Sequence, residues 1–206
     1  MRVTAEKRQA TRARILQEAR ALFASKGWDG TTTRDIARET GIASGTLFNY
    51  FPAKESLGLA LMEEALGHAL HEHNERKGRS EGSLHEALFA LIMTGLRHLQ
   101  PMRKIVGAVA EAALSPFGED RGDAADLRRD HLDAALRLIS SYGTTNEPSH
   151  LVMHTYWTLY VSVLNFWSND ESPNQEDTLA FLDYVTQMFA SSIHANRDTR
   201  ENEHGT

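Results

Sequence analysis

Residues 32–51 read TTRDIARETGIASGTLFNYF, and this stretch decides the fold of the N-terminal part of the chain. Thr32 with Asp35 three residues later has the pattern of a capping box that opens a short helix. Ala37 is small enough to let a second helix approach, and Gly41 tolerates the left-handed conformation of a tight turn. This spacing predicts a helix-turn-helix.

The second helix of this motif is expected to present short polar side chains outward. Ser44 is its predicted N-cap, and Ile42 and Leu47 are the apolar residues that would pack it against the first helix. Short hydroxyl and amide groups suit hydrogen bonds to base edges, so the outward face is predicted to enter a DNA major groove. That face is predicted to comprise Ser44, Gly45, Thr46, Phe48 and Asn49.

Helical patterns continue along the rest of the chain, and no alternating strand pattern or internal repeat is found. The first helix is expected to stop at Gly27, and Pro52 precedes another helix. Clusters of glycine and polar residues then separate helix-length segments. The later helices are expected near 84–99, 102–114, 124–142, 150–167 and 176–195. The sequence therefore predicts an all-α fold.

The charge of the chain is unevenly distributed. The 206 residues include 22 Lys+Arg and 28 Asp+Glu, for a net charge of −6. Residues 1–60 hold ten bases and six acids (10 − 6 = +4), so residues 61–206 carry 12 − 22 = −10. A basic segment joined to an acidic one suggests a nucleic-acid-binding or membrane-binding part, although chance variation on solvated helices is the alternative.

Composition excludes several classes of function. The chain has no cysteine, so it has no disulfide, thiolate zinc site or cysteine nucleophile. The polar, basic N-terminus shows no signal peptide, and we expect a cytoplasmic protein. Residues 148–169 lack Asp, Glu, Lys and Arg, but His154 and Asn165 interrupt this run and both flanks are acidic. A membrane span is therefore not expected.

The last two long helices carry two apolar stripes each. In 150–167 one stripe includes Tyr156 and Val163, and the neighbouring stripe includes Trp157 and Leu164. One stripe would serve the chain's own core and the other would pair with a second copy in a four-helix bundle. The alternative is that both helices are central to a larger monomer core. The predicted dimer residues are Met153, Trp157, Leu164, Phe181, Tyr184 and Met188.

Residues 27–57, GWDGTTTRDIARETGIASGTLFNYFPAKESL, closely resemble the DNA-binding signature of the TetR family of transcriptional regulators. The resemblance covers about residues 8–60 and rests on the combination of D-I-A, a turn glycine, G-T-L-F-x-Y-F and K-E-x-L. Phe48 departs from the family, which very often has tyrosine there, and this removes one possible hydrogen bond to phosphate. The resemblance implies an N-terminal three-helix helix-turn-helix domain joined to a C-terminal helical effector-binding and dimerisation domain.

The resemblance also implies roles for individual residues. Tyr50 and Lys54 match positions that usually hold phosphate. Arg8, Arg12 and Arg14 of the first helix either contact the DNA backbone or are solvated. The predicted DNA-binding residues are Thr32, Thr33, Arg34, Ser44, Gly45, Thr46, Phe48, Asn49, Tyr50 and Lys54.

An effector pocket in the C-terminal part would be built from aromatic residues and methionines, although such residues at helical spacing also form ordinary cores. Arg97 is a lone base within LIMTGLRHLQ, where it would bind a carboxylate or pair with an acid. The predicted pocket residues are Phe89, Met93, Arg97, Met102, Phe117, Trp157, Tyr160 and Asn165.

No sequence motif indicates catalysis, a metal or a cofactor. His68, His71 and His73 lie close together, and His150 and His154 are four residues apart, but neither group has a companion ligand motif. We therefore expect solvated or packed histidines and no enzyme activity. A metal-dependent enzyme built on these histidines is the alternative.

These inferences combine into one expected organisation. Residues 1–52 form the DNA-binding domain, residues 53–195 form the ligand-binding and dimerisation domain, and residues 196–206 form a frayed tail. The expected protein is a repressor that binds double-stranded operator DNA as a homodimer through its last two helices, and a small-molecule effector releases it. An adaptor of the same fold that binds proteins without an operator is the alternative.

Overall fold

The computed structural model describes residues 4–76, 82–114, 123–142 and 148–203, and within these ranges it contains helices and no strands. The all-α prediction is therefore confirmed. The helices are α1 (Ala5–Lys26), α2 (Thr33–Thr40), α3 (Ser44–Phe48), α4 (Lys54–Arg76), α5 (Leu84–Leu99), α6 (Arg103–Ala113), α7 (Asp123–Ser141), α8 (His150–Asn169) and α9 (Glu176–Glu203), with 3₁₀ turns η2 (Gln100–Met102) and η3 (Pro173–Gln175).

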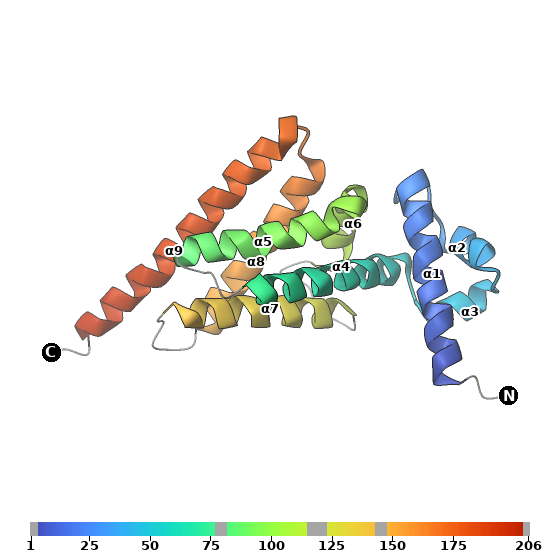
Figure 1. Cartoon of the computed structure of the whole chain (residues 1–206), viewed down its shortest axis with the longest axis horizontal. Coiled ribbons are helices and arrows are strands. Elements are labelled where there is room, and N and C mark those ends of the chain that lie inside the picture. Colours follow the sequence, from blue (N-terminus) through green and yellow to red (C-terminus); the bar gives the residue numbers. More distant parts are fainter. Residues whose placement is uncertain (1–3, 77–81, 115–122, 143–147, 204–206) are drawn as a thin grey trace.

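Helices α1, α2 and α3 form a head at the end of the molecule where the N-terminus lies (Figure 1). Ile15, Ala19 and Phe23 follow one another at a spacing of four residues along α1, and all three are buried in the head core. Ile36 of α2 and Leu47 of α3 meet this face and are completely buried. Burial of these apolar side chains fixes α2 and α3 against α1.

Helix α4 leads from the head into the larger helical part, or body, which contains α5 to α9 (Figure 1). Leu57 and Leu61 in its first two turns belong to the head core. Met62 and Leu66 belong to the body core instead. Because one helix is anchored in both cores, a movement of α4 would be felt by the head and by the body. The expected division of the chain at residues 52 and 53 stays a prediction.

Gly58 of α4 lies where the head and the body pack tightly against each other. A Cβ atom added there would lie 2.5 Å from Cγ2 of Val109 in α6 and 3.1 Å from the ring of Trp28, which follows α1. Only a residue without a side chain lets the three segments pack this closely. Trp28 and Met102 also pack against both cores, so the junction is a continuous apolar contact.

Helix α8 crosses the body, and both of its apolar stripes contribute buried residues, although Phe166 near its end is 41% exposed. Tyr156 and Val163 of one stripe and Trp157 and Leu164 of the other all lie in the interior. Trp157 and Leu164 have no accessible surface, so neither can be covered by a partner subunit as predicted. No helix within the described ranges is both long enough and apolar enough to cross a membrane.

The turn between α8 and α9 is held by two polar side chains. Arg103 of α6 donates to the carbonyl oxygens of Trp167 and Asp170. The Asp170 carboxylate accepts hydrogen bonds from the amide of Ser172 at 2.8 Å and from the amide and hydroxyl of Thr178. These hydrogen bonds lower the pKa of Asp170 below its ordinary value. Arg103 thereby connects the start of α6, next to the head, with the turn into α9.

Candidate nucleic-acid interface

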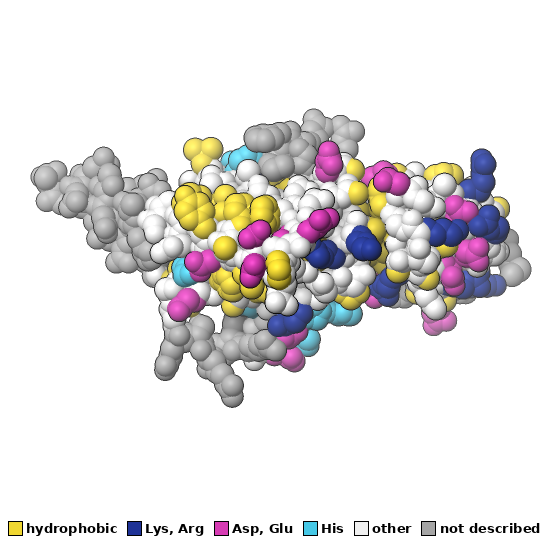
Figure 2. Space-filling view, turned by 90° about the horizontal axis from the view of Figure 1, so that it is seen from above, with side chains coloured by type: hydrophobic (Ala, Val, Ile, Leu, Met, Phe, Trp, Pro, Cys, Tyr) yellow, Lys and Arg dark blue, Asp and Glu magenta, His cyan; other side chains and the backbone are white. Residues whose placement is uncertain are grey.

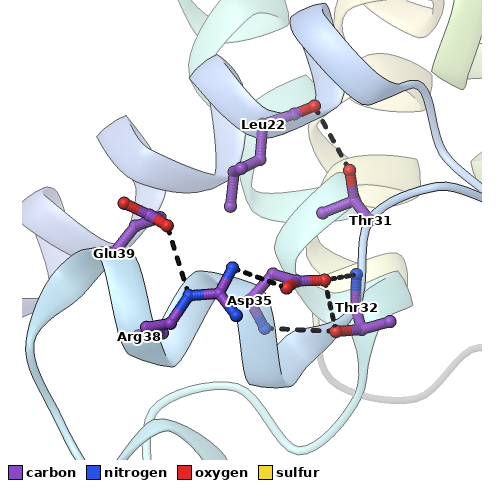
Figure 3. Close-up of polar contacts among 6 residues, drawn as sticks. All are labelled: Leu22, Thr31, Thr32, Asp35, Arg38 and Glu39. Atoms are coloured by element: carbon purple, nitrogen blue, oxygen red, sulfur yellow. Dashed lines mark hydrogen bonds and ion pairs between the residues drawn. The ribbon is translucent and has the colours of Figure 1, made fainter.

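The start of α2 is fixed by the capping box that the sequence predicts (Figure 3). The Thr32 hydroxyl accepts from the Asp35 amide at 3.1 Å, and the Thr32 amide donates to the Asp35 carboxylate at 3.2 Å. Hydrogen bonds from Thr32 lower the pKa of Asp35, and Arg38 pairs with the other carboxylate oxygen at 2.9 Å. Thr32 therefore holds the helix start, while Arg34 is exposed and Thr33 is half-buried.

The turn between α2 and α3 follows the sequence prediction, but the N-cap of α3 does not. Gly41 has φ 69° and ψ 33°, the left-handed conformation, and its amide donates to the Arg38 carbonyl at 3.0 Å. The prediction of Ser44 as N-cap is wrong. Ala43 occupies that position in an extended conformation, without a side-chain cap, and Ser44 is the first helical residue. The backbone of Ala43 still accepts from the amide of Leu47 at 3.1 Å, which begins the helix.

Helix α3 presents most of the predicted groove-facing residues to solvent. Gly45, Thr46 and Asn49 are exposed, and the Phe48 side chain is 46% exposed. Leu47, between them, is completely buried. A short helix anchored by one buried leucine therefore holds a hydroxyl, an amide and an aromatic ring on a single outward surface, with Ser44 half-buried at its edge.

Basic side chains from α1 lie beside the end of α3. The Arg8 guanidinium is 5.9 Å from the centre of the Tyr50 ring, and the Arg12 guanidinium is 5.2 Å from that of Phe51. A groove of about 320 Å³ is lined by Arg8, Arg12, Tyr50, Ala5 and Gln9. The sequence leaves open whether Arg8 and Arg12 contact DNA or are solvated. Their spacing of four residues, on one face of a helix, is the signal that places both beside Tyr50.

Lys54 and Arg14 have partners within the head. The Lys54 ammonium donates to the carbonyl oxygen of Trp28 at 2.9 Å and lies 4.4 Å from the centre of the Trp28 ring. Arg14 donates to the carbonyl oxygen of Thr40 at 2.5 Å, so it links α1 to the C-terminus of α2. Figure 2 shows Lys and Arg side chains gathered toward the head end of the molecule, with Asp and Glu among them.

The predicted effector residues lie in different environments, and the pocket they were assigned to stays a prediction. Arg97 is on the surface, where it pairs with Glu72 of α4 at 2.6 Å. Trp157 and Tyr160 are buried in the body core, and Phe117 lies outside the described residues. The remaining residues, Phe89, Met93, Met102 and Asn165, are half-buried. The sequence reasoning missed His131 of α7 and Tyr156 of α8, which are buried beside Trp157 and Tyr160.

The body has an exposed apolar surface on α9 and the end of α8. Tyr184 is 64% exposed and Met188 is 45% exposed, whereas Leu182, Val185 and Phe189 on the other side of α9 are buried. Figure 2 shows hydrophobic side chains gathered on this part of the body, with Asp and Glu nearby. Phe181 and Met153 are half-buried, while Phe166 and Leu179, which the prediction omitted, are exposed.

Residues 15–61, which span the helix-turn-helix, match the family described as bacterial regulatory proteins, tetR family. The probable HTH-type transcriptional regulator ArpR of Pseudomonas putida is 36% identical over 84 residues, which is 41% of this chain and 39% of ArpR. The HTH-type transcriptional repressor AcnR of Corynebacterium efficiens is 41% identical over 61 residues, covering 30% of this chain and 32% of AcnR. The chain thus spans about two fifths or less of these curated relatives.

Solved structures resemble the whole fold. A TetR transcriptional regulator from Rhodococcus sp. RHA1 matches with a TM-score of 0.67 at 19% identity, over 88% of this chain and 97% of that chain. The Thermus thermophilus FadR, a TetR family transcriptional repressor in complex with lauroyl-CoA, matches with a TM-score of 0.68 at 20% identity, over 86% and 92% of the two chains. At these identities the likeness concerns the fold alone.

Proposed function

We propose that the chain, whose residues 15–61 match the tetR family of bacterial regulatory proteins, is a transcriptional repressor that binds a specific operator in double-stranded DNA. The observation that carries this proposal is the exposure of Thr46 in α3 and of Asn49, which follows its last residue, while Leu47 is buried. A hydroxyl and an amide on a rigid helix suit hydrogen bonds to base edges in a major groove. Arg34 and the groove of Arg8 and Arg12 supply positive charge for phosphates.

We further propose that two copies bind DNA together through the exposed surface of α9. Tyr184 and Met188 are large apolar side chains that a second copy would cover. Two heads on successive major-groove faces would read half-sites about 34–36 Å apart. In this arrangement residues 1–52 bind the operator, residues 53–195 bind the effector and the partner, and residues 196–206 are a tail. The net charge of −10 beyond residue 60 would keep the body away from phosphates.

A small molecule bound in the body is proposed to release the operator. The lauroyl-CoA complex of the similar Thermus thermophilus repressor supports a ligand role for a body of this fold. An effector that binds better when the two heads are placed unfavourably for DNA would shift the population away from the bound state. Helix α4 is the proposed link, since it is anchored in both cores.

The test is selection of duplexes from a random DNA library with the full-length protein, followed by titration of the selected duplex. Thr46→Ala and Asn49→Ala are expected to change which bases are preferred, at a cost of about 1–3 kcal/mol for the selected site. Arg34→Ala is expected to weaken binding to all sequences and to reduce the salt slope by about one. The matched control is Arg20→Ala, which removes the same charge from an arginine that pairs with Glu64. Equal behaviour of all four variants would contradict the proposed site.

A further inference from the structure

Four aromatic side chains form a buried cluster where α7 packs against α8, and it is defined by His131, Tyr156, Trp157 and Tyr160. All four are at most 5% exposed. The His131 ring stacks on Tyr160 with 3.7 Å between ring centres, and its Nε2 lies 3.0 Å from the Tyr156 hydroxyl. Trp157 lies beside Tyr160, with 5.5 Å between ring centres. The cluster thus gathers several hydrogen-bonding groups inside the body core.

Two hydrogen-bonding groups in this cluster have no partner among the described residues, namely Trp157 Nε1 and Tyr160 Oη. Two other polar aromatic groups in the body are paired, since Trp167 Nε1 donates to the side-chain oxygen of Gln175 at 2.9 Å and Tyr156 is bonded to His131. Buried donors without partners are rare because they lose hydrogen bonds to water and gain nothing in exchange. A ligand oxygen placed between these two groups would recover that loss.

The cluster has no ionised member. Burial lowers the pKa of His131 to about 3, and burial raises the pKa of Tyr160 well above its ordinary value, so both side chains are neutral near pH 7. Arg97, the predicted partner for an acidic effector, lies on the surface beside Glu72. Arg128, whose guanidinium lies 5.3 Å from the centre of the Trp157 ring, is only half-buried. A charged ligand buried in the cluster would therefore lose its hydration without a buried opposite charge, which is strongly unfavourable.

The free space beside the cluster is small. A cavity of about 10 Å³, bordered by Tyr156 and Tyr160 together with apolar side chains such as Leu88, Val185 and Phe189, lies between α5, α8 and α9. This volume is about enough for a single water molecule. A larger ligand must therefore displace one of these three helices, and α5 packs against α4. Occupation of the cluster would consequently act on the helix that enters the head.

We infer that this cluster is a ligand site that opens to admit an uncharged, mainly aromatic molecule with an oxygen acceptor, which receives hydrogen bonds from Trp157 Nε1 and Tyr160 Oη. The inference rests on the proposed function, in which the body takes an effector. It adds the residues that orient the ligand and the charge state that the ligand must have.

The experiment is equilibrium dialysis of the full chain, without DNA, against three probes of similar shape. Benzophenone is neutral and carries one carbonyl oxygen, diphenylmethane lacks the oxygen, and 4-benzoylbenzoate adds a carboxylate. Benzophenone is expected to bind about tenfold more tightly than diphenylmethane, because it accepts the two unpaired hydrogen bonds. It is also expected to bind at least about tenfold more tightly than 4-benzoylbenzoate.

Variants test whether the two donors cause this preference. The double variant Trp157→Phe/Tyr160→Phe is expected to bind benzophenone and diphenylmethane within about twofold of each other, since a carbonyl oxygen then finds no donor. Trp167→Phe is the matched control, because its indole N–H already has a partner, and it is expected to keep the tenfold preference. Thermal unfolding provides a second measurement that does not need a ligand. Tyr160→Phe is expected to leave the melting temperature unchanged or higher, whereas Trp167→Phe is expected to lower it.

Several results would overturn the inference: no probe bound by the wild type, tighter binding of 4-benzoylbenzoate, or an undiminished preference in the double variant. A melting temperature lowered as much by Tyr160→Phe as by Trp167→Phe would also overturn it, because Tyr160 would then have a partner in the free protein. If these results occur while a specific operator is still selected, only the ligand site fails. If the probes behave as expected and no operator is selected, the proposed function fails instead.

Discussion

Replacement of His131 by glutamine is expected to remove a specific acid sensitivity of the fold. His131 is 5% exposed, and burial lowers its pKa from 6.5 to about 3. Glutamine does not titrate, but its side-chain amide can still form a hydrogen bond with the Tyr156 hydroxyl, which lies 3.0 Å from His131 Nε2. Comparing the two proteins therefore measures how much stability is lost because His131 cannot bind a proton in the folded state.

The sign and size of the effect follow from the two pKa values. Between pH 6.5 and pH 3 the unfolded chain binds a proton on His131 and the folded chain does not, so the free energy of unfolding falls as the pH is lowered through this window. At pH 5 the pH is about 1.5 units below the pKa of 6.5 that His131 has in the unfolded chain. Protonation then stabilises the unfolded state by about 2 kcal/mol relative to pH 7 or above.

The assay is urea unfolding followed by circular dichroism at pH 7 and pH 5, with the wild type and His131→Gln at equal protein concentration. The wild type is expected to lose about 2 kcal/mol more than the variant between the two pH values. Titration of the other histidines affects both proteins and cancels in this difference. If both proteins lose the same free energy, His131 is not buried as a neutral group and the reasoning about the cluster is refuted.

Three further predictions concern the junction, the turn and the dimer surface. Gly58→Ala is expected to lower the free energy of unfolding by about 1–3 kcal/mol, because its Cβ would lie 2.5 Å from Val109. In the control Gly67→Ala, in the same helix, the added Cβ meets nothing within 4 Å, and the free energy of unfolding is expected to rise by about 0.5–1 kcal/mol. Equal urea midpoints for the two variants would contradict the close packing at Gly58. Gly41→Ala, at φ 69°, is expected to cost about 1 kcal/mol in thermal unfolding, and an unchanged melting temperature would count against the left-handed turn. Tyr184→Arg is expected to shift the protein toward monomer in sedimentation velocity, because the exposed ring is proposed to be covered by a partner; an unchanged distribution would place the interface elsewhere.

Features set by neighbouring residues were predictable from the sequence. The capping box of Thr32 and Asp35 and the positive φ of Gly27 and Gly41 are local properties, because each depends on a few adjacent residues. The helix-turn-helix combined these local signals with one buried leucine, Leu47, and the structure places it as expected. Even here the N-cap was misplaced by one residue, since Ala43 caps α3 through its backbone alone.

Features set by distant contacts were not predictable. The two apolar stripes of α8 are equivalent in the sequence, and only packing in three dimensions shows that both Trp157 and Leu164 face the chain's own core. Arg97 pairs with Glu72, which is 25 residues away and whose position depends on how α4 meets α5. His131 gave no sequence signal, because a single histidine on an amphipathic helix is as compatible with solvent as with a buried cluster.

The central claim, that α3 reads a DNA sequence, is tested most directly by one ratio of affinities. The affinity of the full-length protein for a duplex selected from a random library is compared with its affinity for a scrambled duplex of the same composition, at one fixed salt concentration. The account predicts a ratio of at least about 10³ in the wild type. Equal affinities for the two duplexes would contradict it, because the exposed Thr46 and Asn49 would then carry no sequence information.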